Sequence, residues 1–288
     1  MNQRVAFLCL GTMGYPMAGH LARAGCEMSV YNRSANRAKA WVAEFGGRLA
    51  STPADAVQDV EFAFVCSGDD DDVRSVVQGE TGVLAGLGKG SILVDHTTAS
   101  AQLARELASV AEQQGIGFLD APVSGGQSGA QNAALTVMVG GRAEVFERVA
   151  PLLACYAKKT ALIGEAGAGQ LAKMVNQICI AGLLQALSEG LDFASKSGVD
   201  VERVVDVISA GAAQSWQLDN RAATMLEGKF DFGFAVDWMR KDLAIALAEA
   251  ARNGANLELT ALVDRLYAEV QASGGGRLDT SSLIGRLQ

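Results

Sequence analysis

Histidine is scarce in this 288-residue chain, which contains only His20 and His96. Two imidazoles cannot build a histidine-rich metal centre, and a Ser–His–Asp hydrolase would have to use one of them. Cysteine is limited to five residues, an odd number of widely scattered positions, which argues against a disulfide or metal framework. We expect all five to serve as small core residues: Cys9, Cys26, Cys66, Cys155 and Cys179.

Long basic runs and long apolar runs are also absent. The formal net charge is −8, and no cluster of Lys and Arg offers the phosphate contacts on which nucleic-acid binding depends. No apolar run approaches the roughly 20 residues that a membrane span needs, and the first residues do not follow the pattern of a signal peptide. We therefore expect a soluble, cytoplasmic protein that binds neither nucleic acid nor membrane.

What the chain does have, from residue 1 to about 163, is an alternation of short apolar segments with amphipathic ones. This alternation predicts a doubly wound α/β domain, in which helices cover both faces of a parallel sheet. The expected strands are residues 4–9, 27–31, 61–66, 91–95, 116–120, 134–139 and 160–163. The expected helices include residues 34–45, 71–77, 100–114 and 142–154.

The pattern changes after residue 163. Residues 169–197 form a nearly unbroken helical stretch that is apolar on most sides, and no strand pattern follows it. Such a helix must be buried against other helices, here those of its own domain and of a second subunit. We expect an all-α domain over residues 164–288, entered through this long interdomain helix.

A glycine turn follows the first expected strand. The chain reads Cys9-Leu10-Gly11-Thr12-Met13-Gly14, then an apolar helix to Gly25 and a second strand ending at Tyr31. Such a βαβ unit suits a dinucleotide, because glycines let backbone N–H groups approach the pyrophosphate at the helix N-terminus. The usual GxGxxG pattern would place a glycine where Cys9 stands. We expect a Rossmann-type domain over residues 1–163, with the turn residues Leu10, Gly11, Thr12, Met13 and Gly14 contacting the cofactor.

The residues after the second strand indicate which dinucleotide is bound. An acidic residue there would bind the ribose hydroxyl groups of NAD, but this chain has Asn32, Arg33 and Ser34, with Arg37 nearby. A guanidinium and a hydroxyl group can bind a 2′-phosphate, which a carboxylate would repel. We therefore predict NADP as cofactor, with NADPH preferred over NADH. The alternative is that Arg33 is a solvated loop residue.

Two further turns lie at the carboxyl ends of expected strands, where ligands of open α/β sheets bind. Cys66 ends one strand and Ser67 follows it, and Thr98 follows the next strand, so all three are candidate cofactor contacts. The acidic run 69–72 could suggest a metal site, but acids also stabilise a helix N-terminus, and we predict no metal. His96 is expected to be a surface or capping residue, with a catalytic role as the alternative.

Two later segments carry candidate chemistry. In Asp120-Ala-Pro122-Val-Ser124-Gly125-Gly126, glycines free backbone N–H groups to bind a carboxylate. In the segment from Gly164 to Gln177, Lys173 lies one turn into the long helix, and Asn176 shares its face. Burial disfavours the charged form of a lysine and lowers its pKa toward the range useful for proton transfer. The alternative is that the amine of Lys173 extends to solvent.

Taken together, these segments resemble the β-hydroxyacid dehydrogenase family, which includes 3-hydroxyisobutyrate dehydrogenase, tartronate semialdehyde reductase and glyoxylate/succinic semialdehyde reductases. Four motifs match in order along the whole chain: CLGTMGYPMA, DAPVSGG at 120–126, GxxGxGxxxK from Gly164 to Lys173, and Met239-Arg-Lys241-Asp242-Leu. The resemblance implies an NADPH-preferring oxidoreductase that interconverts a small β-hydroxyacid and its semialdehyde or keto form, and that is a homodimer or homotetramer.

The resemblance also implies roles for individual residues. Lys173 would be the general acid and base, with Asn176 orienting the substrate. Ser124, Gly125 and Gly126 would bind the substrate carboxylate. From the helical domain, Lys241 would close over the cofactor, Asp242 would fix its surroundings, and Phe234 would cover nicotinamide and substrate. Residues that could shape the substrate pocket are Gln214, Ser215, Trp216 and Trp238.

The sequence departs from the family at three places. Cys9 replaces a glycine, His96 stands where a small residue is common, and Gln177 stands where many members have an asparagine. Gln177 is therefore the alternative to Asn176 as a substrate residue. Two other functions are considered: an imine reductase of similar architecture, and a dinucleotide-binding module without catalysis. Members of both groups usually lack the lysine, so Lys173 argues against each.

Overall fold

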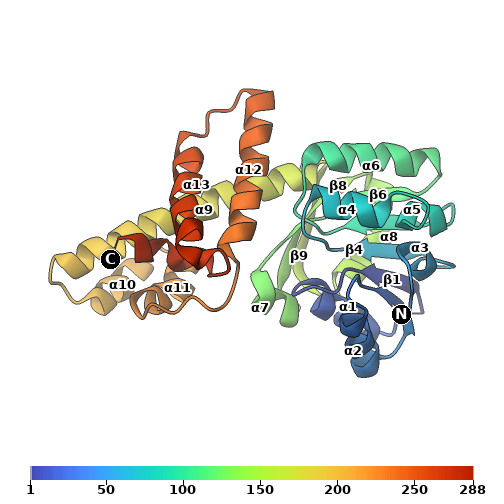
Figure 1. The fold of residues 1–288 in the computed structure, drawn as a ribbon, viewed down its shortest axis with the longest axis horizontal. Coiled ribbons are helices and arrows are strands. Elements are labelled where there is room, and N and C mark those ends of the chain that lie inside the picture. The colour runs from blue at the N-terminus through green and yellow to red at the C-terminus, as the bar shows by residue number, and fades with distance from the viewer. Residues whose placement is uncertain (1, 288) are drawn as a thin grey trace. The chain divides into compact units, whose positions relative to one another are not determined.

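A computed structural model of the chain describes residues 2–287 and contains two compact units, residues 1–173 and residues 174–288. The first unit is built on a nine-stranded sheet with the order β3-β2-β1-β4-β5-β6-β8-β7, in which β9 also pairs with β8 (Figure 1). The strands are β1 (Arg4–Leu8), β2 (Glu27–Tyr31), β3 (Arg48–Leu49), β4 (Phe62–Val65), β5 (Ile92–Asp95), β6 (Gly117–Asp120), β7 (Val123–Ser124), β8 (Leu135–Gly141) and β9 (Ala157–Gly164).

The sheet is parallel only in part. Strands β3, β2, β1, β4, β5 and β6 run parallel to their neighbours, as expected for a doubly wound domain. Strand β8, however, runs antiparallel to β6 and to β7, so the sheet is mixed at this end. Apolar alternation reports which residues are buried and carries no information on strand direction, so the sequence could not reveal the reversal.

Helices cover both faces of this sheet. The helices of the first unit are α1 (Gly14–Arg23), α2 (Ala35–Phe45), α3 (Pro53–Ala56), α4 (Asp70–Val77), α5 (Val83–Gly86), α6 (Ala101–Gln113), α7 (Gly126–Gln131) and α8 (Ala143–Leu153). Figure 1 shows α4, α5 and α6 on one side of the sheet and α1 and α2 on the other.

Strand β1 shows how one segment serves two cores. Successive side chains of a strand point to opposite faces. Val5 and Phe7 pack with Met17 and Trp41 of α1 and α2, whereas Ala6 and Leu8 belong to a second cluster with residues of α4 and α6. Because both faces are buried, β1 reads as a continuous apolar run and not as an alternating one.

The second unit is helical over its described residues. Helix α9 (Ala168–Lys196) begins in the first unit and continues into this one. It is followed by α10 (Val201–Ser209), α11 (Trp216–Leu226), α12 (Val236–Asn253), α13 (Glu258–Val270), η1 (Gln271–Gly275) and η2 (Thr280–Arg286). Leu184 of α9 packs with Leu243 of α12 and Tyr267 of α13, and Leu191 packs with Leu218 of α11.

Helix α9 is long and apolar enough to cross a membrane by length and composition alone. However, buried residues of α9 pack in the hydrophobic clusters of the second unit, as Leu184 and Leu191 do. Other apolar side chains on it are exposed in the single chain, including Val175 at 61% and Phe193 at 74%.

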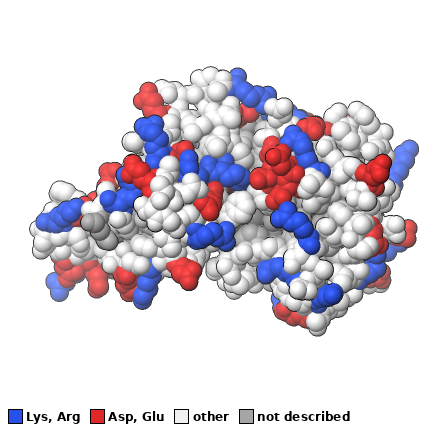
Figure 2. Space-filling model, in the orientation of Figure 1, with Lys and Arg blue, Asp and Glu red and all other residues white. Residues whose placement is uncertain are grey.

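Basic and acidic residues lie interspersed on the face of the molecule drawn in Figure 2.

Candidate active site

The glycine turn between β1 and α1 has the backbone geometry of a dinucleotide-binding loop. Cys9 has a φ of 71°, in the left-handed region that favours glycine, which explains why related turns place a glycine there. A Cβ atom on Gly14 would lie 2.2 Å from the carbonyl oxygen of Cys9, so only glycine fits that position. A Cβ on Gly11 would meet no atom within 4 Å, which leaves open space beside the turn.

The first turn of α1 also suits an anion. It contains no acidic residue, and the first N–H groups of a helix have no partner inside the helix. Gly11 and Thr12 are exposed, Met13 is half-buried, and Leu10 and Gly14 are buried. The residues present at this turn therefore fit the pyrophosphate of a dinucleotide.

The residues after β2 divide into a structural and an exposed group. Asn32 supports the turn: its Oδ1 accepts a hydrogen bond from the Leu10 N–H at 2.8 Å, and its Nδ2 donates to the carbonyl oxygen of Ser34. The Arg37 guanidinium donates to the carbonyl oxygen of Leu10. Arg33 is largely exposed, with its Nη1 3.3 Å from Oδ1 of Asp72. Arg33 is thus the cation of this group that extends from the turn.

The loops after β4 and β5 are joined to each other. The Ser67 N–H donates to Oγ1 of Thr97 at 2.9 Å, and the Thr97 N–H donates to Oδ1 of Asp95 at 2.9 Å. Burial raises the pKa of Asp95 to about 7. The three predicted contacts lie just after the carboxyl ends of β4 and β5: Cys66, Ser67 and Thr98. All three are half-buried, so each remains partly accessible to a ligand.

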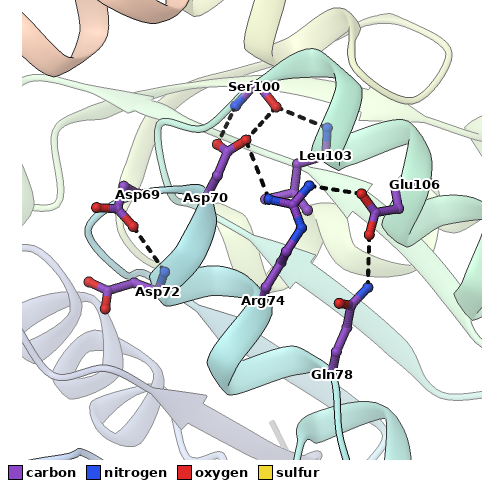
Figure 3. Close-up of polar contacts among 8 residues, drawn as sticks. All are labelled: Asp69, Asp70, Asp72, Arg74, Gln78, Ser100, Leu103 and Glu106. Atoms are coloured by element: carbon purple, nitrogen blue, oxygen red, sulfur yellow. Dashed lines mark hydrogen bonds and ion pairs between the residues drawn. The ribbon is translucent and has the colours of Figure 1, made fainter.

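The acidic residues at the start of α4 make structural contacts, as Figure 3 shows. Asp69 caps α4 by accepting from the Asp72 N–H at 2.9 Å. Asp70 accepts from the N–H and hydroxyl of Ser100 at 2.8 and 2.6 Å, and Arg74 reaches Glu106 of α6 at 2.8 Å. These contacts connect α4 to α6 and restrain the loop after β4 and the loop after β5, which precede these helices.

His96 is a core residue, so the expectation of a surface or capping histidine was wrong. It is 2% exposed, with Nδ1 2.6 Å from the Ala121 carbonyl oxygen and Nε2 2.8 Å from the Tyr156 hydroxyl group. Because a carbonyl oxygen can only accept, Nδ1 carries the proton and Nε2 accepts from Tyr156. Burial lowers the pKa of His96 to about 4, so the ring is neutral.

The expectation that all five cysteines are core residues also fails in part, since Cys179 is exposed in the single chain.

The segment after β6 combines a short strand with two glycines of positive φ. Ser124 lies on β7, opposite Thr136 of β8, and is half-buried. Gly125 and Gly126 have φ values of 133° and 61°, a backbone region that residues with side chains rarely adopt. A Cβ on Gly126 would meet no atom within 4 Å. Their backbone is thus accessible to a small ligand beside Ser124.

Lys173 lies near the start of α9, in the first unit, and is only 7% exposed. The alternative of an amine extended into solvent therefore does not hold in this structure. The first turn of α9 is fastened to the sheet by Asp120, to which the N–H groups of Gly167 and Gln170 donate at 2.7 and 2.9 Å. Asp120 and Gln170 were not among the predicted site residues, although Asp120 begins the DAPVSGG motif.

Four predicted residues form a continuous chain of contacts in the second unit. Asn176 Nδ2 donates to Gln177 Oε1 at 2.7 Å, and Gln177 Nε2 donates to Asp242 Oδ2 at 2.6 Å. The Lys241 Nζ lies 2.9 Å from the other oxygen of Asp242. Gln177 and Asp242 are each 2% exposed, so the chain is fixed in the core and presents Asn176 and Lys241 at its two ends.

The backbone of Phe234 is held by Asp279, which is not part of this chain of contacts. Its N–H donates to Oδ2 of Asp279 at 2.9 Å, and Asp279 also pairs with Arg221 at 3.3 Å. The Arg221 guanidinium lies over the ring of Trp216 and over that of Phe232, with its carbon 4.9 and 4.8 Å from their centroids. Among the other pocket candidates, Ser215 caps α11 through the Leu218 N–H.

A Rossmann-type sheet with a dinucleotide turn, followed by a helical unit, defines a class of dinucleotide-dependent oxidoreductases. Comparisons with known proteins narrow this class. Residues 4–164 match a family model described as the NAD binding domain of 6-phosphogluconate dehydrogenase. Residues 167–287 match the model described as NAD-binding of NADP-dependent 3-hydroxyisobutyrate dehydrogenase.

Similar proteins span the whole chain. An uncharacterized oxidoreductase of Shewanella frigidimarina is 58% identical over 99% of this chain and 98% of its own length. The 2-hydroxy-3-oxopropionate reductase of Escherichia coli is 36% identical, covering 99% and 97%. The structure of Mycobacterium tuberculosis 3-hydroxyisobutyrate dehydrogenase with L-serine superimposes with a TM-score of 0.91 at 32% identity, covering 100% of both chains.

The chain therefore belongs to the β-hydroxyacid dehydrogenase family, and it is an NAD(P)-dependent hydroxyacid dehydrogenase or semialdehyde reductase. The resemblance seen in its four motifs is confirmed, as is the fold class.

Proposed function

We propose that this enzyme is an NADPH-preferring oxidoreductase that interconverts a small β-hydroxyacid, or a related short hydroxyacid, and its semialdehyde or keto form. The observation that carries the proposal is the burial of Lys173 on a helix whose first turn is fastened to the carboxyl end of β6. A buried amine at the ligand edge of a dinucleotide-binding sheet is suited to move a proton.

In this proposal Lys173 is the general acid and base. In the direction of reduction, its ammonium group donates a proton to the carbonyl oxygen of the substrate. In the direction of oxidation, its neutral amine accepts the proton of the substrate hydroxyl group. The bound nicotinamide supplies or accepts the hydride. The low exposure of Lys173 keeps bulk water from competing for the same proton.

Substrate binding is assigned to two groups of residues. Ser124 and the backbone of Gly125 and Gly126 bind the carboxylate, which the open space beside Gly126 supports, since a Cβ there would meet no atom within 4 Å. Asn176 orients the substrate, held in place by its hydrogen bond to Gln177. Phe234 covers the reacting groups, as the family resemblance implies.

The cofactor is assigned mainly to the glycine turn and the loops after the neighbouring strands. Gly11, Thr12 and Met13 bind the pyrophosphate with Leu10 and Gly14 shaping the turn, and Cys66, Ser67 and Thr98 line the nicotinamide side. Arg33 and Ser34 bind the 2′-phosphate, while Asn32 holds the turn beneath them. Lys241 acts from the helical unit, with Asp242 fixing its ammonium group. The match to a family model of NADP-dependent enzymes supports this choice.

The two alternative functions are less well supported. An imine reductase and a non-catalytic dinucleotide-binding module share the architecture, but neither explains a buried lysine near the start of α9. The carboxylate site proposed at Ser124 and the two positive-φ glycines is one that a module without catalysis does not need.

A substrate panel assayed with both cofactors tests the proposal. We expect semialdehydes, glyoxylate or short hydroxyacids to change the absorbance of NADPH or NADP, with kcat/KM at least tenfold higher than with NADH or NAD. Replacing Arg33→Ala should lower kcat/KM for NADPH at least tenfold and leave the value for NADH within threefold. A tenfold preference of the wild-type enzyme for NADH would overturn the cofactor assignment.

We also propose that the enzyme is a homodimer or homotetramer, assembled through the apolar side chains that α9 exposes in the single chain. Phe193 and Val175 are the most exposed of these. A lipid environment does not suit α9, because its first turn is hydrogen-bonded to the sheet and its middle lies in a helical core. A second copy of the chain can cover this surface while α9 stays in place.

A further inference from the structure

Asp120 is a fully buried carboxylate at the end of β6, and both its oxygens face the start of α9. The Gly167 N–H donates to Oδ1 at 2.7 Å and the Gln170 N–H donates to Oδ2 at 2.9 Å. Charged acceptors at a helix N-terminus gain both hydrogen bonds and the favourable interaction with the helix dipole. Burial raises the pKa of Asp120, and these backbone donors act in the opposite direction.

Two glycines bring α9 against the sheet at this point. A Cβ on Gly140 of β8 would lie 2.5 Å from Asp120 Oδ1 and 2.8 Å from the Gly169 nitrogen. A Cβ on Gly169 would lie 2.5 Å from the Met138 carbonyl oxygen and 2.8 Å from that of Asp120. Neither position has room for a side chain, so the helix backbone rests directly on β6 and β8.

Gln170 connects the same turn of α9 to the loop after β5. It is 1% exposed, its Oε1 accepts from the Ala99 N–H at 3.0 Å, and its Nε2 donates to the Thr97 carbonyl oxygen at 2.7 Å. Thr97 in turn accepts from the Ser67 N–H through its Oγ1. The start of α9 is therefore hydrogen-bonded both to β6 and to the loops that carry the candidate cofactor contacts.

We propose that Asp120 and Gln170 are positioning residues that fix the axial position and rotation of α9, and thereby hold Lys173 where it exchanges a proton with the substrate. The proposal rests on the proton-transfer role given to Lys173 above. Lys173 follows Gln170 by three residues, which places it about 4.5 Å further along the helix and on a neighbouring part of its surface.

The expected effect on catalysis is large because reacting groups tolerate little displacement. A misplacement of about 1 Å can cost on the order of a hundredfold in rate. The pyrophosphate-binding turn lies on β1 and α1, and β4 and β5 separate β1 from β6 in the sheet, so most of the NADPH affinity should persist even though Gln170 also contacts the loop that carries Thr98. Loss of kcat with retained cofactor affinity is therefore the kinetic signature of this arrangement.

Two variants of the full-length enzyme test the proposal. Asp120→Asn keeps the shape but directs an amide N–H group toward a backbone donor, and Gln170→Met keeps the length but loses both side-chain hydrogen bonds. We expect each to lower kcat at least tenfold, while KM for the substrate and the dissociation constant of NADPH, measured by its fluorescence, change less than threefold. Amide hydrogen exchange of residues 167–173 should accelerate at least tenfold, and that of residues 4–14 should not.

Asp200→Asn is the control, because Asp200 also accepts a hydrogen bond from the first turn of a helix, α10, through the Arg203 N–H, but lies in the second unit. It should leave kcat and exchange at 167–173 unchanged. A kcat within threefold of wild type in a folded variant would overturn the proposal, as would unchanged exchange at 167–173. A parallel loss of NADPH affinity with faster exchange throughout residues 4–164 would also overturn it, by showing general loosening.

The exchange measurement needs no substrate, so it separates this proposal from the proposed function. A wild-type enzyme that is inactive on every hydroxyacid and semialdehyde of the panel would contradict the proposed function. Exchange at 167–173 would still report whether Asp120 and Gln170 hold the start of α9. If Asp120→Asn does not fold, Gln170→Met provides the test alone.

Discussion

Asp95 and His96 are adjacent buried groups whose protonation states respond to burial in opposite ways. Burial raises the pKa of Asp95 to about 7 and lowers that of His96 to about 4. Both changes favour the neutral form, as expected where water is excluded. The His96 ring is therefore neutral near pH 7, whereas about half of the Asp95 carboxyl groups are protonated there.

Asp95 gives a stability effect with a defined sign. Between about pH 4 and pH 7 the folded chain keeps a proton on this carboxyl that the unfolded chain, with a pKa of about 3.9, has lost. The contribution of Asp95 to the free energy of unfolding therefore falls as pH rises through this window. His96 acts in the opposite sense below about pH 6.5, because the unfolded chain then binds the additional proton.

The variant Asp95→Asn isolates the contribution of the carboxyl, since an amide oxygen can still accept from the Thr97 N–H. As pH rises from 5 to 8, wild type loses stability through Asp95 and the variant does not. We therefore expect the free energy of unfolding of the variant minus that of wild type to increase by more than about 1 kcal/mol, one pKa unit being worth about 1.4 kcal/mol. Urea denaturation of both proteins at the two pH values measures this. A constant difference would show that Asp95 titrates normally in the folded chain.

Single residues also mark the limit of what sequence can reveal. The left-handed φ of Cys9 agrees with the glycine that related turns place there. The burial of His96 was missed, because its partners Ala121 and Tyr156 are 25 and 60 residues away. A histidine with two distant neutral partners leaves no local pattern in the sequence.

At the scale of elements, strong periodicity located most helices and strands. The expected segments near α2, α4, α6, α8 and α9 are helical, and the expected strands are present. The two-residue strands β3 and β7 were missed, since so short a segment has no measurable period. The role of Asp120 was missed for another reason: a carboxylate that caps a helix 47 residues later is visible only once the fold brings them together.

Helix α9 offers two glycines with opposite expected responses to the same substitution. Gly169→Ala places a methyl group 2.5 Å from the Met138 carbonyl oxygen, so we expect a loss of at least about 2 kcal/mol in the free energy of unfolding. At Gly190 no atom lies within 4 Å of an added Cβ, and Gly190→Ala should be neutral or stabilise by about 0.5–1 kcal/mol. Denaturant unfolding measures both, and equal effects would contradict the packing described for the start of α9.

At the scale of the whole molecule, the exposed apolar side chains of α9 predict self-association. We expect wild-type protein at micromolar concentration to sediment as a dimer or tetramer, and Phe193→Glu to shift it toward monomer, because a charge would then be buried in the interface. Leu49→Glu, at a residue on strand β3 that is 38% exposed, is the control and should not change the sedimentation. A wild-type monomer in analytical ultracentrifugation would show that α9 is not an oligomer interface.

The central claim concerns Lys173, and its direct test is the kcat of Lys173→Met with the best substrate of the panel, at saturating NADPH. Methionine keeps much of the length and fills the same buried volume but cannot transfer a proton. General acid and base catalysis is worth about 10²–10⁴-fold, so we predict a fall in kcat of that size with unchanged NADPH affinity. A kcat within threefold of wild type would contradict the assignment of Lys173 as the proton donor and acceptor.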